Sequence, residues 1–346
     1  MAQETNSYFR NKKATVSFIL SLFVFFIHFC SFSVFLQADG MLKRVFDTLL
    51  HVARVAVPLF FMISAAMFFR NYTLRDTAKK LKRRFFSLCI PYLVWNTIWL
   101  ILGLLGYYTP LGAFAGGVKV SLSLENVLRG VFLHGQFEPF WFMLQLIIMT
   151  AFCPVIYLLV KNKWVGIVAI TAFYILYCFG FRFQQPLVPD TSMVIYYLVG
   201  AWVGVHYFDL FTGKRDKKLA AAGLAMFIIC CLFRIMRSSL PAWIPFEEVL
   251  PVLTVISCIA FWVCMDFFAF ERCPAFLNES FAIYAMHSLI GAMLARAIAM
   301  LLPAGNGYLV LNAVLSFPAT VAIICAFSIT LKKHAPGVSK ILFGRM

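Results

Sequence analysis

The sequence predicts an all-α polytopic membrane protein, with about ten transmembrane helices in one bundle. Of its 346 residues, 62% are apolar and 13% charged, whereas soluble domains are roughly 45–50% apolar. The mean hydropathy is +0.88. Apolar runs of about 20 residues recur, which is the length that crosses a bilayer as a helix. Because the runs lack the alternation of barrel strands, helices are the way to satisfy their backbone groups in lipid.

Ten spans can be drawn in a single transmembrane domain that covers residues 1–346. Lys and Arg gather in alternate connections, starting with Arg10, Lys12 and Lys13 before the first span. This bias predicts that both termini are cytoplasmic. The expected location is the inner (plasma) membrane. The predicted spans lie at about 14–36, 51–69, 85–106, 139–160, 164–181, 191–208, 219–237, 248–270, 278–299 and 308–331.

The composition argues against several other classes of protein. The net charge of +16 comes from basic residues in short connections between apolar runs, which indicates contact with anionic lipid and no nucleic-acid partner. The ten cysteines are scattered and lack CxxC spacing, so neither a disulfide framework nor a metal site is predicted.

Two histidines lie inside predicted spans. His28 stands in the first uncharged run, ATVSFILSLFVFFIHFCSFSVFL. An ionisable group in a membrane helix costs free energy and is therefore a functional-site hypothesis; the alternative is a histidine hydrogen-bonded into the bundle. His28 is predicted about 14 residues, roughly 21 Å, into the span and so nearer the external face. His287 lies in the ninth span, where it could assist catalysis or fill the core.

Basic and aromatic residues near the span ends carry further hypotheses. Five of the six positions from Lys79 to Arg84 are basic, which suits a phosphate-rich cytosolic ligand or, equally, lipid headgroups. Pro91 predicts a kink near the start of the third span. Arg54 could snorkel to the interface or point inward at an anion.

A long external segment from Tyr107 to Glu138 precedes the fourth span. It contains Gly116 and His134 and an amphipathic piece, and a loop of this length is often a lid or binding element. It leads to Trp141, which could be an aromatic-belt anchor or could stack on a sugar ring.

Five segments, in this order, resemble the acyltransferase-3 family of integral-membrane O-acyltransferases. They are LFVFFIHFCSF, VPLFFMISAAMFF, KKLKRRFFSLCIPYLVW, PFWFMLQL and SFAIYAMHSLI. The sequence departs from the family pattern at Ser17, where a basic residue is common, and at Ala65, where glycine is usual. The paired-arginine motif before the third span is represented by Lys80 and Arg83.

The resemblance implies transfer of an acyl group, most often acetyl, from cytosolic acyl-CoA to a hydroxyl of an envelope glycan or lipid-linked sugar. Acyl-CoA would be the donor substrate, and no cofactor is expected. His28 would act as a general base or as an acylated relay, with His287 as the second catalytic candidate. The alternative function is a transporter or flippase of a lipid-linked sugar or small polar solute. The predicted phosphate-binding residues are Lys80, Lys82, Arg83 and Arg84, and the predicted acceptor-binding residues are Trp141, Glu138 and Arg54.

Overall fold

The computed structural model describes an all-helical protein, and no strand occurs in the described part of the chain. Each of the ten predicted spans is largely helical. The described residues are 2–32, 34–109, 119–133, 137–182, 187–241, 243–268, 270, 273–302 and 305–344. The predicted features at Gly116 and His134 lie outside them.

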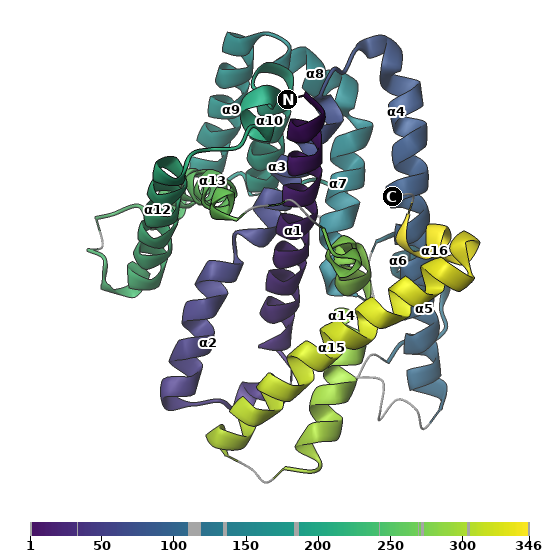
Figure 1. Ribbon diagram of the computed structural model, residues 1–346. Coiled ribbons are helices and arrows are strands. Elements are labelled where there is room, and N and C mark those ends of the chain that lie inside the picture. The colour runs from purple at the N-terminus through teal and green to yellow at the C-terminus, as the bar shows by residue number, and fades with distance from the viewer. Residues whose placement is uncertain are drawn as a thin grey trace. The chain divides into compact units, whose positions relative to one another are not determined.

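The helices follow one another along the chain (Figure 1). Their bounds are α1 (Ala2–Phe29), α2 (Gly40–Ala53), α3 (Ala56–Phe69), α4 (Thr77–Arg84), α5 (Ile90–Tyr108), α6 (Leu124–Phe132), α7 (Trp141–Ala151), α8 (Cys153–Val160), α9 (Lys163–Cys178), α10 (Thr191–His206), α11 (Phe208–Thr212), α12 (Lys217–Ile235), α13 (Phe246–Cys264), α14 (Ser280–Ala299), α15 (Asn306–His334) and α16 (Pro336–Phe343).

Seven helices among the described residues are long and apolar enough to cross a membrane. The bent pair α7 and α8, which meet at 68°, would add an eighth. Helices α9 and α10 are apolar but only 16 residues long each. The seven are Ser7–Phe29, Gly40–Phe69, Leu74–Tyr108, Lys217–Ile235, Phe246–Phe267, Ser280–Ala299 and Asn306–His334.

The first helix lies earlier in the chain than the predicted span 14–36. Helix α1 begins at Ala2 and ends at Phe29. The chain then turns, and the Phe29 ring packs on those of Phe32 and Phe35, at centroid distances of 5.5 and 4.4 Å. His28 is therefore in the last turn of α1. Lys12, predicted to lie before the span, is inside the helix and buried.

The third span begins with irregular helix. A π-helical turn, Phe85–Cys89, joins α4 to α5 just before Pro91, the residue at which a kink was predicted. A π-helical turn has one more residue between hydrogen-bonded groups than an α-helical turn, and such turns are frequent at functional sites.

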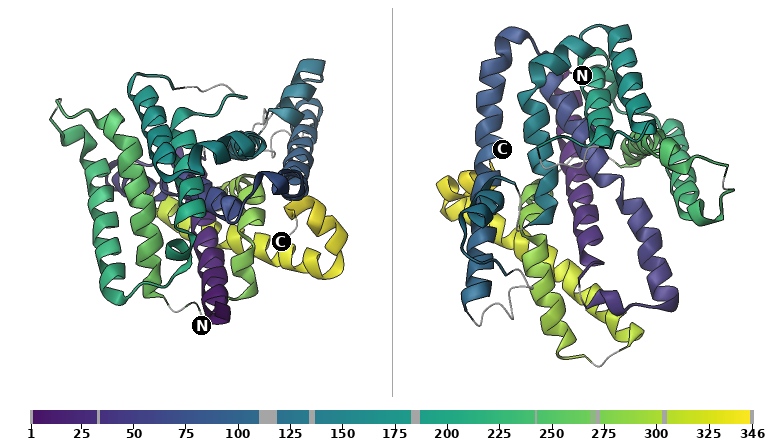
Figure 2. Two further views of the ribbon diagram at one scale, coloured as in Figure 1. Left: turned by 90° about the horizontal axis from the view of Figure 1, so that it is seen from above. Right: turned by 180° about the vertical axis from the view of Figure 1, so that it is seen from behind.

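The chain forms two compact units, and unit 1 comprises Met1–Leu20, His51–Leu81 and Ile148–Leu277. Its α3 and α10 pack so closely that a Cβ on Gly200 would lie 2.4 Å from the Met62 carbonyl oxygen, and one on Gly204 would lie 2.5 Å from that of Ala66. Small residues four apart permit this close approach of the α3 and α10 backbones. Helices α12 and α13 also run side by side (Figure 2).

Unit 2 comprises Ser21–Leu50, Lys82–Ile147 and Asn278–Met346. Its α14 packs along α15, where the buried Glu279 carboxylate accepts hydrogen bonds from Ser328 (2.6 Å) and Lys332 (2.6 Å). The last helix, α16, packs on α5, and Trp95 Nε1 donates to the Leu342 carbonyl at 2.8 Å. Helix α6, the amphipathic piece of the predicted external segment, also packs on α5.

Candidate functional site

Two histidines of unit 2, far apart in the sequence, come into ring contact. His28 is in the last turn of α1 and His287 is in the middle of α14. Their ring centroids are 5.4 Å apart and the ring planes are inclined by 36°. His28 is half-buried, whereas His287 is fully buried. The two predicted catalytic candidates therefore share one site.

The hydrogen bonds of His287 define which of its nitrogens is available. Nδ1 lies 2.8 Å from the Tyr284 carbonyl oxygen and 3.1 Å from that of Ile283. Because a carbonyl oxygen only accepts, Nδ1 carries the proton and donates. In the neutral ring Nε2 is then an acceptor, and it is buried without a hydrogen-bond partner among the described residues. An unmet buried acceptor costs about 1–3 kcal/mol, so a bound hydroxyl or N–H donor would be stabilised there.

Aromatic rings surround the imidazole of His287. Phe25, Phe137 and Tyr284 lie at centroid distances of 5.5, 5.8 and 6.4 Å. Gly291 leaves the space that the Phe25 ring occupies, since a Cβ there would lie 2.8 Å from Phe25. The site is thus largely apolar, which strengthens any electrostatic interaction made within it.

Glu138 adjoins the same site along the chain. It follows Phe137, whose ring centroid lies 5.8 Å from that of His287, and its own side chain is exposed. It opens a single helical turn, Glu138–Phe140, and the Tyr284 hydroxyl donates to the Pro139 carbonyl at 2.5 Å. The turn is therefore tied to the helix that carries His287.

Trp141, the first residue of α7, is half-buried and belongs to the same unit as the histidines. Arg54 belongs to unit 1, where it is exposed at the break between α2 and α3. The acceptor-binding roles of Trp141, Glu138 and Arg54 stay predictions.

The predicted phosphate-binding residues differ in what they contact. Lys80, in unit 1, donates to the carbonyl oxygens of Phe68 (2.6 Å) and Arg70 (3.0 Å) and so caps the end of α3. Lys82 and Arg83, in unit 2, are exposed, and Arg84 is half-buried just before the π-helical turn. A phosphate would have to compete with backbone carbonyls for Lys80, and the binding role of all four residues stays a prediction.

Sequence reasoning missed Tyr284 and Phe137 as parts of this site. Tyr284 precedes His287 by three residues, and this spacing places both on one helix face, so a signal was available for it. No sequence pattern pointed to Phe137, because its contact with α14 is made only in the folded unit. Within the described residues, no group of three or more His, Cys, Asp or Glu side chains could hold a metal ion.

A comparison with protein families matches residues 18–332 to the acyltransferase-3 model, described as an acyltransferase domain. The chain belongs to the acyltransferase-3 family. Comparisons with curated proteins and with solved structures find no match. The resemblance drawn from the five sequence motifs is thereby confirmed, and the matched range includes both histidines.

Membership of the acyltransferase-3 family defines the general activity. The protein is a multi-pass membrane acyltransferase, which needs an acyl donor and an acceptor substrate in a lipid environment. An acyltransferase also needs a group that accepts a proton from the acceptor, and a paired imidazole is suited to this task.

Proposed function

We propose that the protein is an O-acyltransferase of the inner membrane. It moves an acyl group, which we propose to be acetyl, from cytosolic acyl-CoA to a hydroxyl of an envelope glycan or lipid-linked sugar. The observation that supports this proposal best is the contact between His28 and the buried His287, whose Nε2 has no partner among the described residues. Holding an unmet acceptor in an apolar site costs stability, which is understandable if a substrate completes it.

In the proposed reaction, His28 takes the proton of the acceptor hydroxyl while the hydroxyl oxygen attacks the thioester carbonyl carbon. The new C–O bond forms, the C–S bond breaks, and the proton passes to the leaving sulfur to give the free CoA thiol. In this proposal the Glu138 carboxylate stabilises the protonated His28 meanwhile. His287 Nε2 accepts a hydrogen bond from the acceptor or from His28 and so positions it.

An alternative route with the same residues uses His28 as a covalent relay. Its imidazole would take the acyl group from the thioester, release CoA, and pass the group to the acceptor hydroxyl. Mixing radiolabelled acetyl-CoA with purified protein in the absence of acceptor distinguishes the routes. A relay leaves label on the protein that His28→Ala abolishes, whereas a general base leaves none.

On the cytosolic side, we propose that the exposed Lys82 and Arg83, with Arg84, bind the CoA phosphates. Arginine and lysine suit phosphate groups by charge and by hydrogen bonding. Lys80 is close to these residues in sequence and adds positive charge to the group. Its ammonium stays hydrogen-bonded to the carbonyls at the end of α3.

Incorporation of labelled acetyl into envelope glycan, by membranes supplied with acetyl-CoA, tests the proposal. We expect His28→Ala to lower incorporation at least about 100-fold, the scale of general-base catalysis. The matched control is His334→Ala, because His334 is exposed at the end of α15. Intact incorporation in well-expressed His28→Ala protein, or movement of a lipid-linked sugar without CoA, would overturn it.

A further inference from the structure

Unit 1 contains a pocket that the acyltransferase site does not use. Its volume is about 250 Å³, and it is bounded by α3, α10, α11 and α13. Aliphatic and aromatic side chains form most of its wall, including Leu59, Met62, Val203 and Ile259. A wall of this kind fits a hydrocarbon chain.

The pocket lies near the ends of the helices that form it. Helices α3, α10 and α13 end at Phe69, His206 and Cys264, close to the pocket residues Ala66, Val203 and Val263. Leu59 lies ten residues before the end of α3, which is about 15 Å along the axis. The pocket therefore runs from a helix-end face into the apolar part of the unit, as a lipid tail would.

Aromatic residues at this face are the types that sit at a membrane surface. Trp202, Tyr207 and Trp262 all line the pocket. The indole of Trp262 donates to the Phe211 carbonyl at 3.0 Å, and that of Trp202 donates to the Lys163 carbonyl at 3.1 Å. Tryptophan and tyrosine are enriched at the headgroup level of membranes.

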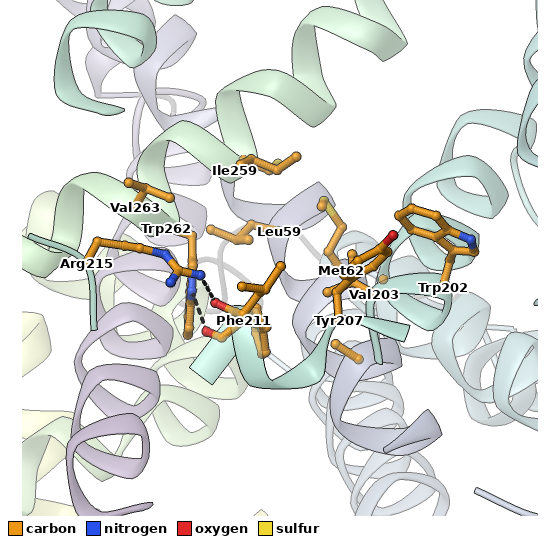
Figure 3. A pocket seen from close by; sticks show the side chains of 14 residues that line it. Leu59, Met62, Trp202, Val203, Tyr207, Phe211, Arg215, Ile259, Trp262 and Val263 are labelled. Atoms are coloured by element: carbon orange, nitrogen blue, oxygen red, sulfur yellow. Dashed lines mark hydrogen bonds between the residues drawn. The ribbon is translucent and has the colours of Figure 1, made fainter. Parts of the chain in front are cut away.

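One cation lies at an end of the pocket. Figure 3 shows Arg215 at one end of the lining side chains and Trp202 at the other. The backbone N–H of Arg215 donates to Asp266 at 3.3 Å, and one guanidinium nitrogen donates to the Leu210 carbonyl. A guanidinium has five N–H donors, so donors remain for a phosphate in bidentate geometry.

The charge around Arg215 favours an anion. Lys214, Lys217 and Lys218 are close in sequence and exposed. Of the neighbouring acids, Asp216 caps α12 by accepting from the Leu219 N–H at 2.8 Å, and Asp266 is held by Lys12 at 2.6 Å. Basic clusters at a membrane surface attract anionic lipid.

We infer that this pocket binds an anionic phospholipid, with the phosphate on Arg215 and one acyl chain along the wall that Leu59, Met62 and Val203 form. The combination of an apolar channel and a single cation at its end fits an amphiphile of this type better than a soluble polar ligand, which would need more polar partners. This inference is independent of the proposed acyl transfer.

Native mass spectrometry of the purified full chain tests the inference. The protein in detergent is mixed with equal amounts of phosphatidylglycerol and phosphatidylcholine that carry identical acyl chains. The detergent is then removed in the spectrometer, and the lipid that stays bound is identified. We expect one phosphatidylglycerol to be retained preferentially, and Arg215→Gln to weaken its retention about tenfold, as for a charge-assisted hydrogen bond. Ile259→Trp should weaken retention as well, because the added ring fills the channel.

The matched control is Arg75→Gln, which removes the same charge from an exposed residue of the same unit that does not line the pocket. Equal retention of the two lipids, or unchanged retention in a monodisperse Arg215→Gln protein, would overturn the inference. Displacement of phosphatidylglycerol by excess acetyl-CoA would also overturn it, since the pocket would then serve the acyl donor. If Arg215→Gln does not stay folded, Ile259→Trp decides by the same criterion.

Discussion

At the scale of single residues, the protein buries polar groups in two different ways. In unit 1, Lys12 and Asp266 form an ion pair of 2.6 Å with side chains 1% and 0% exposed, and the Tyr8 hydroxyl donates to the same carboxylate at 2.5 Å. The Lys12 ammonium also lies 4.5 Å from the Trp262 ring centroid. In unit 2, His287 Nε2 has no hydrogen-bond partner within the described ranges. The first arrangement serves the fold, and we interpret the second as serving a substrate.

The substitution His287→Phe should separate stability from activity. Phenylalanine keeps the ring among Phe25, Phe137 and Tyr284 and removes the unmet acceptor, which costs about 1–3 kcal/mol. We expect the melting temperature in detergent to stay the same or rise, while acetyl transfer falls at least about tenfold. A lower melting temperature with full transfer activity would instead assign His287 a purely structural role.

The Lys12–Asp266 pair should respond in the opposite way. Lys12→Met leaves a buried carboxylate without its cation, and breaking a buried pair costs about 3–5 kcal/mol. We expect a clear fall in melting temperature and a substantial recovery in the double variant Lys12→Met/Asp266→Asn, in which the charge is gone and the Tyr8 hydroxyl keeps an acceptor. Additive losses in the double variant would show that the two side chains are not coupled.

At the scale of elements, the contact between α3 and α10 depends on glycine. The backbone carbonyls of Met62 and Ala66 occupy the places where side chains of Gly200 and Gly204 would be. Since lipid tails are as apolar as the side chains, helices in a membrane associate through such close packing and not through the hydrophobic effect. The same contact forms part of the wall of the lipid pocket.

The substitution Gly200→Ala should therefore destabilise the protein. The new methyl group would meet a carbonyl oxygen at 2.4 Å, and overpacking of this kind costs about 1–3 kcal/mol. The matched control is Gly307→Ala in α15, where a Cβ would meet nothing within 4 Å. We expect a lower melting temperature for the first variant and no loss for the second; equal melting temperatures would refute the close-packing argument.

At the scale of the whole molecule, the number of crossings decides where the termini lie. Seven crossings would put the termini on opposite faces, whereas eight or ten would put both on one face. The described helices satisfy the length criterion seven times, or eight with the bent pair α7 and α8. Ten crossings would require α9 and α10, at 16 residues each, to cross where the bilayer is thin or locally deformed.

Topology reporters test this prediction. Alkaline phosphatase, which is active only outside the cytoplasm, should be inactive when fused to the C-terminus, and a fluorescent N-terminal fusion should be bright. With ten crossings, phosphatase inserted at Val188, between α9 and α10, should be active. Inactive enzyme at Val188 would support eight crossings, and an active C-terminal fusion would contradict the cytoplasmic placement of that end.

The sequence by itself determined the all-helical membrane class and the family, and it located the helical segments approximately. These follow from local properties: hydropathy over about 20 residues, the alternation of basic connections, and short motifs such as SFAIYAMHSLI around His287. It also singled out His28 and His287, because an ionisable side chain in an apolar run is costly wherever the run packs.

Only the tertiary structure decided which of these residues meet. The contact between His28 and His287 joins positions far apart in the chain, and no spacing rule links them. Lys12 looked like a positive residue outside the first span until the structure paired it with Asp266. Helix ends, buried pairs and pockets depend on which side chains pack together. Hydropathy averaged along a segment does not identify the partner that a side chain will contact.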